Sequence, residues 1–284
     1  MILPYYTPKS TFDRYIVAKM EKKRILHFAH GNGFPAGTYG KLLGLLRLEY
    51  DVIAIEKLGH NPSYPIDENW AGLVEELINY VEKNAREPVI GVGHSMGSLL
   101  TFLAAYHRPD LFRLIIMLDP PVLYGPAAFF FLVSKKLNLL HRKGLIAHSM
   151  KRPTEWSSSS EAADYFKRNP PFNRFDPECL RDYMHYGIIT SETGAKLSFD
   201  VNLEIHIFKT TPHNLNCLRK RLLVPGTMVL GEYTNMPAGY MVSRFAKRQG
   251  LLLERFKEGS HVFPFEYPLR TASLIKETID RLDR

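Results

Sequence analysis

The sequence predicts an α/β fold in which a mostly parallel sheet carries helices on both faces and a mainly helical cap is inserted late. Three observations predict it. Short apolar runs alternate with longer helical patterns over the first 120 residues, an irregular stretch covers residues 121–222, and the alternation then resumes. Strands and helices that alternate in this way form a parallel sheet between two layers of helices.

The expected strands are short apolar runs bounded by turn residues, and the expected helices are the periodic segments between them. The strands are expected at residues 24–29 (RILHFA), 51–55 (DVIAI), 88–93 (PVIGVG), 113–118 (RLIIML), 227–230 (TMVL) and 251–256 (LLLERF), with one further possible strand at 203–208. The helices are expected at residues 38–47, 70–84, 95–108 and 238–249 and from residue 267 onwards.

The irregular stretch predicts a cap over one edge of the sheet. We expect residues 1–120 and 223–284 to form the core and residues 121–222 to form the cap. Pro120-Pro121 marks the entry to the cap and Pro225-Gly226 marks the exit, because both pairs interrupt regular structure.

Composition restricts the partners of this chain. It has 37 Lys+Arg against 29 Asp+Glu, a formal net charge of +8. A basic balance suits nucleic acid or an anionic surface, but the basic residues are scattered and form no run of five or more. We therefore expect no nucleic-acid partner. The most apolar segment, residues 111–133, is interrupted by Arg113, Asp119 and three prolines, so we expect no membrane span.

The cysteine count predicts the compartment. The two cysteines, Cys179 and Cys217, have no partner Cys or His at metal-ligand spacing. Because a disulfide framework needs more cysteines than this, we expect a reduced, cytoplasmic setting and no metal site. Residues 1–15 contain two prolines and no continuous apolar stretch after a basic start, so we expect no signal peptide.

Ser95 is the candidate nucleophile. It lies in Gly93-His94-Ser95-Met96-Gly97, between an expected strand and an expected helix. This context is the one that a nucleophile elbow requires, because a sharp strand-to-helix turn exposes the serine above the sheet. The hydroxyl also lies at a helix N-terminus, where the helix dipole favours developing negative charge.

A glycine-rich turn follows the first expected strand, at His30-Gly31-Asn32-Gly33. Such a turn can direct a backbone N–H toward an oxygen that gains charge during acyl transfer. We expect Asn32 to supply one N–H of this oxyanion hole and Met96 to supply the other. We expect His30 to hold the loop by hydrogen bonds and His94 to be a buried packing residue.

His261 is the candidate general base. It follows the last expected strand and precedes the last expected helix, in Glu258-Gly259-Ser260-His261-Val262. The carboxyl edge of the sheet would carry both this loop and Ser95, and a base that follows the nucleophile in the chain is typical of this arrangement.

Together these motifs resemble the α/β-hydrolase superfamily over essentially the whole chain. The segments that carry the resemblance are HGNGFP at residues 30–35, LGHNPS at 58–63, GHSMG at 93–97 and GSHVFPFEYP at 259–268. The longer HGNGFPAGTY, with LDPP at 118–121, resembles a subgroup of uncharacterised bacterial hydrolases and acyltransferases. The resemblance implies hydrolysis of an ester or a related acyl group without a cofactor, and it does not name the substrate.

The acid of the triad departs from the pattern of the family. Most members carry an aspartate shortly after the strand that ends TMVLG here, but Thr234 occupies that place. A threonine cannot stabilise an imidazolium electrostatically. Two substitutes are available: Asp119, directly after the strand at 113–118, where some members carry their acid, and Glu232, near the usual place. We favour Asp119.

We therefore expect a serine hydrolase, of carboxylesterase or lipase type, that acts through an acyl-enzyme intermediate. Apolar cap residues such as 129–133 (FFFLV) would suit a small-molecule substrate with an apolar acyl or aromatic group. A thioesterase, a carbon–carbon bond hydrolase or an acyltransferase would use the same residues. A non-catalytic binding protein is a further alternative, which the missing aspartate supports.

Overall fold

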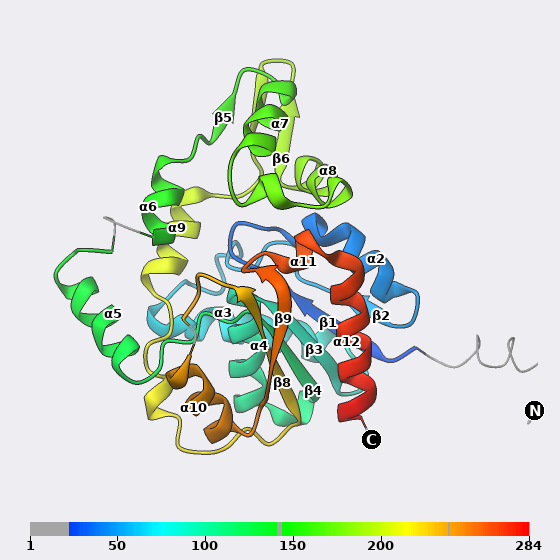
Figure 1. Ribbon diagram of the computed structural model, residues 1–284, viewed down its shortest axis with the longest axis vertical. Coiled ribbons are helices and arrows are strands. Elements are labelled where there is room, and N and C mark those ends of the chain that lie inside the picture. Colours follow the sequence, from blue (N-terminus) through cyan, green and yellow to red (C-terminus); the bar gives the residue numbers. More distant parts are fainter. Residues whose placement is uncertain (1–22, 141–143, 238, 284) are drawn as a thin grey trace, which may run out of the picture.

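Six strands form the main sheet of the computed structural model, which describes residues 23–140, 144–237 and 239–283 (Figure 1). The strands are β1 (Ile25–Ala29), β2 (Asp51–Ile53), β3 (Val89–His94), β4 (Phe112–Leu118), β8 (Gly226–Tyr233) and β9 (Leu252–Ser260). Their order is β2-β1-β3-β4-β8-β9, and every neighbouring pair is parallel. The predicted fold class is confirmed. The expectation of no signal peptide concerns residues outside the described ones.

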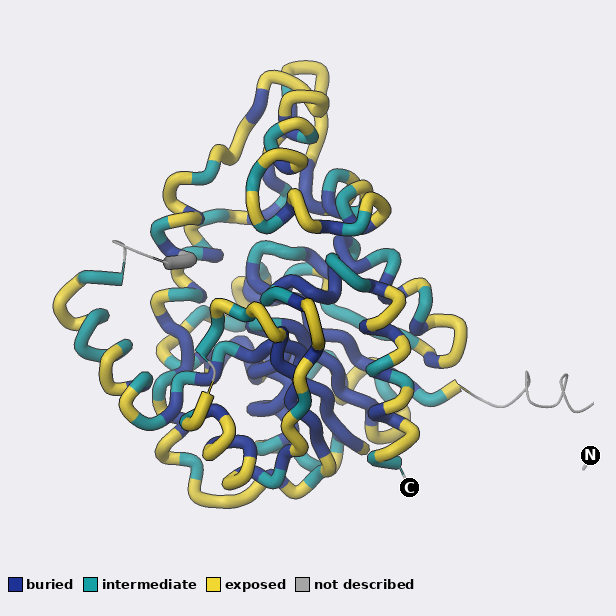
Figure 2. The backbone as a smooth tube through the Cα atoms, in the orientation of Figure 1, coloured by how far each residue is buried: buried dark blue, intermediate teal, exposed yellow. Residues whose placement is uncertain are grey.

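Helices cover both faces of this sheet. On one face lie α2 (Gly40–Arg47) and α12 (Pro268–Leu282), and on the other lie α3 (Ala71–Asn84), α4 (Met96–His107) and α10 (Tyr240–Gln249) (Figure 1). Strand side chains alternate between the two faces. In β3, Ile90 and Val92 therefore pack with α2 and α12, while Val89 packs with α3 and α4. Figure 2 shows the central strands buried along their length.

Residues 121–222, which we propose as the cap, form their own set of elements (Figure 1). Its helices are α5 (Pro126–Lys136), α6 (Gly144–Lys151), α7 (Ser159–Arg168), α8 (Pro177–Tyr186) and α9 (Val201–Lys209). The strands β5 (Glu155–Trp156), β6 (Ile188–Ser191) and β7 (Gly194–Leu197) form a small antiparallel sheet in the order β5-β7-β6. This sheet was not expected, because strands of two to four residues are too short to show a periodic pattern.

The prediction of a possible strand at residues 203–208 was wrong, because these residues belong to helix α9. The Asp200 side chain caps the helix by accepting a hydrogen bond of 2.7 Å from the Asn202 backbone N–H. Glu204 and Ile207, three positions apart, form the buried face. The short apolar run at residues 203–208 therefore belongs to an amphipathic helix rather than to a strand.

Short elements connect the larger ones. They are the 3₁₀ helices η1 (Ala36–Tyr39), η2 (Glu68–Trp70), η3 (Pro109–Leu111), η4 (Phe172–Arg174) and η5 (Leu215–Cys217), and the single turn α11 (Phe263–Glu266). No helix in the described part of the chain is both long enough and apolar enough to cross a membrane.

Candidate active site

Ser95 lies in the sharp turn between β3 and α4. Its backbone has φ 52° and ψ −119°, an uncommon conformation for a residue with a side chain. Its N–H donates to the Leu118 carbonyl at 2.9 Å, which holds the turn against the end of β4. A Cβ on Gly97 would lie 2.1 Å from the Ala29 carbonyl oxygen, and a Cβ on Gly93 would lie 2.3 Å from that of Gly97. Only glycine fits at either position.

His261 lies between Ser95 and Asp119. Its Nε2 is 3.0 Å from Ser95 Oγ, and its Nδ1 is 2.6 Å from Asp119 Oδ2. Since the carboxylate can only accept, Nδ1 carries the proton and Nε2 is free to accept from the serine hydroxyl. The sequence placed these residues after three different strands, and the structure brings them into one hydrogen-bonded chain.

Asp119 follows β4 and has a fully buried side chain. Its Oδ1 accepts a 2.8 Å hydrogen bond from the Gly231 backbone N–H, and its Oδ2 accepts from the Thr234 hydroxyl as well as from His261. A buried carboxylate needs such donors to replace water. Thr234 therefore donates to Asp119 from the place where most members of the family that the sequence resembles carry an aspartate.

Glu232, the alternative acid, forms no hydrogen bond with His261 among the described residues. Its side chain is exposed, and its Oε2 accepts a hydrogen bond of 2.7 Å from the Glu258 backbone N–H. Of the two carboxylates considered from the sequence, the structure places Asp119 against Nδ1 of His261.

Glu266 holds the loop that carries His261. Its carboxylate accepts from the Ser260 backbone N–H and from the Ser260 hydroxyl, both at 2.8 Å. It also forms an ion pair with Arg174 of the cap, with 2.7 Å between Nε and Oε1. No role was expected for Glu266 from the sequence, although an acidic residue in the segment GSHVFPFEYP was a visible signal.

The two expected oxyanion donors lie near Ser95: Met96 follows it in the chain, and Asn32 lines the same pocket. Met96 is the first residue of α4, directly after Ser95, and Asn32 lies in the turn after β1. Both residues are buried or nearly so. The Asn32 side-chain amide donates to the Glu204 carbonyl at 2.9 Å, which joins this turn to helix α9 of the cap.

His30 and His94 are buried neutral histidines. Burial lowers the pKa of His30 to about 4 and that of His94 to about 3. His30 Nε2 accepts from the Leu58 N–H at 2.8 Å, while its Nδ1 lies 2.8 Å from the Gly31 carbonyl, which matches the expected role of holding the loop. His94 was expected only to pack, but both of its ring nitrogens have hydrogen-bond partners.

A pocket of about 630 Å³ opens onto Ser95 and His261. One part of its wall is apolar and the other is polar. The apolar residues are Phe34, Pro170, Pro171, Phe172, Phe208, Met236 and Val262, and the polar ones include Asn32, His148, Ser149, Arg152, Arg174, Glu204 and Asn235. The lining residues between positions 148 and 208 belong to the proposed cap, which therefore forms much of the wall around Ser95.

An ion pair is buried in the cap wall of this pocket. The side chains of Arg152 and Glu204 are 6% and 5% exposed, and Ser149 Oγ donates to Glu204 Oε1 at 3.0 Å. Burial alone would lower the pKa of Arg152, but the adjacent Glu204 carboxylate more than offsets it and raises the pKa. This pair was not predicted from the sequence, because its members are 52 positions apart.

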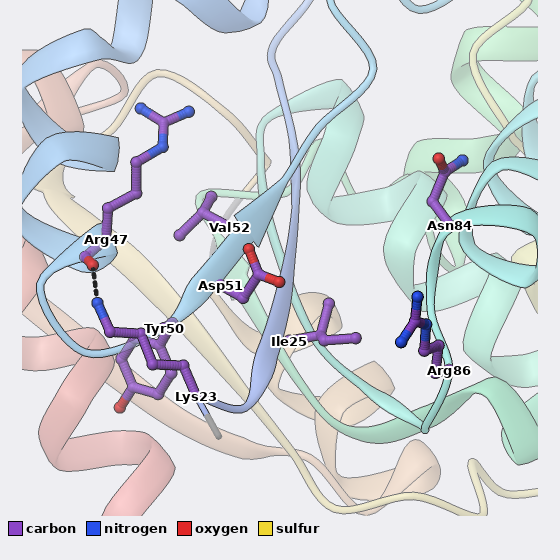
Figure 3. A pocket seen from close by; sticks show the side chains of 8 residues that line it. All are labelled: Lys23, Ile25, Arg47, Tyr50, Asp51, Val52, Asn84 and Arg86. Atoms are coloured by element: carbon purple, nitrogen blue, oxygen red, sulfur yellow. Dashed lines mark hydrogen bonds between the residues drawn. The ribbon is translucent and has the colours of Figure 1, made fainter. Parts of the chain in front are cut away.

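A second pocket, of about 640 Å³, lies at the opposite edge of the sheet (Figure 3). Lys23, Arg47, Asp51 and Arg86 line it near the amino ends of the strands. Among the described residues, its lining contains no serine, cysteine or histidine. Within the described ranges, no group of three or more His, Cys, Asp or Glu side chains is arranged to hold a metal ion.

The chain is similar to one family of proteins over most of its length. Residues 28–274 match the family described as "Alpha/beta hydrolase family". The monoglyceride lipase of Rattus norvegicus is 32% identical over 283 residues, which cover 94% of this chain and 84% of the lipase. A crystal structure of E-2-(acetamidomethylene)succinate hydrolase has a TM-score of 0.70 at 17% identity and covers 91% of each chain. A peroxisomal α/β-hydrolase of Saccharomyces cerevisiae has a TM-score of 0.67 at 16% identity, over 91% of this chain and 77% of the other.

Proposed function

Because the chain belongs to the alpha/beta hydrolase family, we propose that it is a serine hydrolase that cleaves esters through an acyl-enzyme intermediate. One observation carries the proposal. His261 bridges Ser95 and Asp119, with 3.0 Å between Nε2 and Oγ and 2.6 Å between Nδ1 and Oδ2. A hydroxyl nucleophile, an imidazole base and a carboxylate in this order are the groups that acyl transfer needs.

In the first half of the reaction, Ser95 Oγ attacks the carbonyl carbon of the ester while its proton passes to His261 Nε2. Asp119, bonded to Nδ1, stabilises the imidazolium that forms. The tetrahedral intermediate then collapses, the bond to the leaving oxygen breaks, and Nε2 gives its proton to that oxygen. The acyl group remains on Ser95 as an ester, and the alcohol departs.

In the second half, a water molecule gives a proton to Nε2 and attacks the acyl carbon. Collapse of the second intermediate breaks the bond to Ser95 Oγ, and His261 returns the proton to the serine. The products are the free carboxylic acid and the original enzyme.

The backbone N–H groups of Asn32 and Met96 form the proposed oxyanion hole. Among the residues that the structure describes, neither N–H donates to a protein acceptor. The Asn32 side chain is already bonded to Glu204, so its backbone N–H is the free donor at this position. A preorganised donor of this kind typically contributes about 3 kcal/mol of transition-state stabilisation.

The pocket favours a small ester with an apolar acyl or aromatic group. Phe34, Phe172 and Phe208 line it beside the nucleophile, and they would exclude water from such a group. In the polar part of the wall, the side-chain amide of Asn235 offers hydrogen bonds to the other side of the substrate. The similarity to a monoglyceride lipase supports including a monoacylglycerol among the test substrates.

Labelling with a fluorophosphonate probe tests the nucleophile. We expect the wild type to be labelled and Ser95→Ala to be unlabelled, because only an activated serine reacts. Ser243→Ala, at an exposed position of α10 where the hydroxyl donates to the Gly239 carbonyl at 3.1 Å, is the matched control and should keep the label. A wild type that remains unlabelled would contradict the proposal.

Turnover of p-nitrophenyl esters with short and long acyl chains, and of a monoacylglycerol, tests the substrate class. A thioester of the same acyl chain distinguishes an esterase from a thioesterase, which the same three residues would serve. A thioester that turns over much faster than the matched ester would contradict the ester assignment while leaving Ser95 as the nucleophile.

A further inference from the structure

A buried hydrogen-bonded chain connects the three segments that carry the proposed donor, nucleophile and base. The Gly31 backbone N–H donates to the Tyr39 hydroxyl at 3.0 Å, and Tyr39 Oη is 2.7 Å from His94 Nδ1. At the other side of the ring, His94 Nε2 is 2.8 Å from the backbone carbonyl oxygen of His261. Tyr39 and His94 are each 1% exposed.

The direction of each hydrogen bond follows from its partners. The carbonyl of His261 can only accept, so His94 Nε2 carries a proton. Burial lowers the pKa of His94 to about 3, and the ring is therefore neutral near pH 7, with an unprotonated Nδ1. Nδ1 must accept from the Tyr39 hydroxyl, whose oxygen in turn accepts from Gly31. The chain thus runs in one direction, from Gly31 through Tyr39 and His94 to His261.

Each end of this chain is adjacent to a group that acts in the proposed reaction. Gly31 directly precedes Asn32, and His94 directly precedes Ser95. The far end is His261 itself, held by its backbone carbonyl. Three segments that are distant in sequence are therefore linked by two side chains that do not touch the reacting atoms.

Packing leaves these groups little freedom to move. A Cβ on Gly31 would lie 3.1 Å from Tyr39 Oη, 3.2 Å from His94 Nδ1 and 3.4 Å from Ser95 Cβ. The ring of Phe265 lies 4.4 Å from that of Tyr39, centroid to centroid. A displacement of Tyr39 or His94 would consequently move the turn at Gly31 or the loop at His261.

We propose that Tyr39 and His94 are positioning residues, which set the Asn32 N–H and the His261 imidazole relative to Ser95. This inference rests on the proposed function, since it assigns the two residues to the same reaction. Misplacement of a catalytic group by about 1 Å can lower a rate roughly 100-fold, so the loss should appear in kcat rather than in KM.

Four variants test the proposal by kcat and KM on a p-nitrophenyl ester. Tyr39→Phe removes only the hydroxyl, and we expect kcat to fall about 10-fold with little change in KM. His94→Leu removes both ring contacts and should lower kcat about 100-fold. His94→Gln keeps an N–H donor for the His261 carbonyl and should recover part of that loss. Tyr80→Phe is the matched control, because the Tyr80 hydroxyl donates only to the Ala54 carbonyl, away from the site.

A second readout follows His261 directly and does not depend on turnover. The Nδ1 proton shared with Asp119 should give a downfield ¹H NMR signal, which Tyr39→Phe and His94→Leu should move upfield and Tyr80→Phe should not. Tyr39→Phe with the kcat and the Nδ1 signal of the wild type would overturn the proposal. If the His94→Leu variant does not fold, the kcat and the Nδ1 proton signal of Tyr39→Phe and His94→Gln test the positioning role. An unlabelled, inactive wild type would overturn the proposed function instead, and the NMR comparison would then decide the positioning role alone.

Discussion

The Thr234 hydroxyl donates a hydrogen bond to Asp119 Oδ2, the same oxygen that accepts from His261 Nδ1 at 2.6 Å. Asp119 directly follows β4 and Thr234 directly follows β8, and these two strands are neighbours in the sheet. An acid at either place can therefore reach the same histidine. In this chain the earlier strand carries the carboxylate, and the later one carries a donor that orients it.

Thr234→Val should lower kcat about 10-fold, because a hydrogen bond to a charged group contributes about 1.5–3 kcal/mol. The measurement is kcat on a p-nitrophenyl ester. The control is Thr227→Val in β8, the strand that Thr234 follows, since Thr227 Oγ1 is buried and has no hydrogen-bond partner among the described residues. Equal activity of the two variants would remove the proposed role of Thr234.

Asp119→Asn should lower kcat by about 10⁴-fold, as expected when the residue that sets the tautomer of a catalytic histidine is lost. Glu232→Gln should change kcat by less than about twofold, because Glu232 is exposed and bonded to the Glu258 N–H. The two carboxylates are thereby compared by the same assay. A larger loss in Glu232→Gln than in Asp119→Asn would reverse the assignment of the acid.

The free energy of unfolding should fall as the pH drops below 6.5. Burial lowers the pKa of His27 to about 3, of His30 to about 4 and of His94 to about 3, from 6.5. Below pH 6.5 the unfolded chain binds protons that the folded chain does not, so stability is lost as the pH falls from 6.5 toward these values. The loss should approach about 1.4 kcal/mol per histidine for each pH unit.

Urea unfolding between pH 4 and pH 8 measures this dependence. His27→Leu should flatten it, since neither ring nitrogen of His27 has a hydrogen-bond partner in the described part of the chain. It should also leave the pH 8 stability little changed, because an apolar side chain suits the same buried position. An unchanged pH dependence in His27→Leu would show that His27 does not contribute.

Arg152→Met should destabilise the protein by about 3–5 kcal/mol, because it leaves the Glu204 carboxylate buried without its charged partner. The double variant Arg152→Met/Glu204→Met should recover most of that loss, since it removes both charges. Urea unfolding of the two single variants and the double variant gives the coupling energy. A double variant that is as unstable as the sum of the two single variants would indicate that the pair is not coupled.

The sequence by itself determined most of the main sheet and singled out Ser95 and His261 as candidate site residues. Buried strands are short, apolar and flanked by turns, so β1, β3 and β4 were visible within one or two residues. Ser95 and His261 were visible because a strand-to-helix turn and a loop after the last strand both lie at the carboxyl edge of a parallel sheet. These signals are local, and neighbouring residues carry them.

Only the tertiary structure decided which carboxylate meets His261 and which residues hold the site in place. Asp119 directly follows β4 and Glu232 lies at the end of β8, and only the path of the chain in space separates the two. Thr234, Tyr39 and the cap pair of Arg152 with Glu204 act across long sequence separations, where no periodicity or spacing relates the partners. The physical reason is that a hydrogen bond depends on distances of a few ångströms in space, and the order of residues constrains those distances only within one element and its turns.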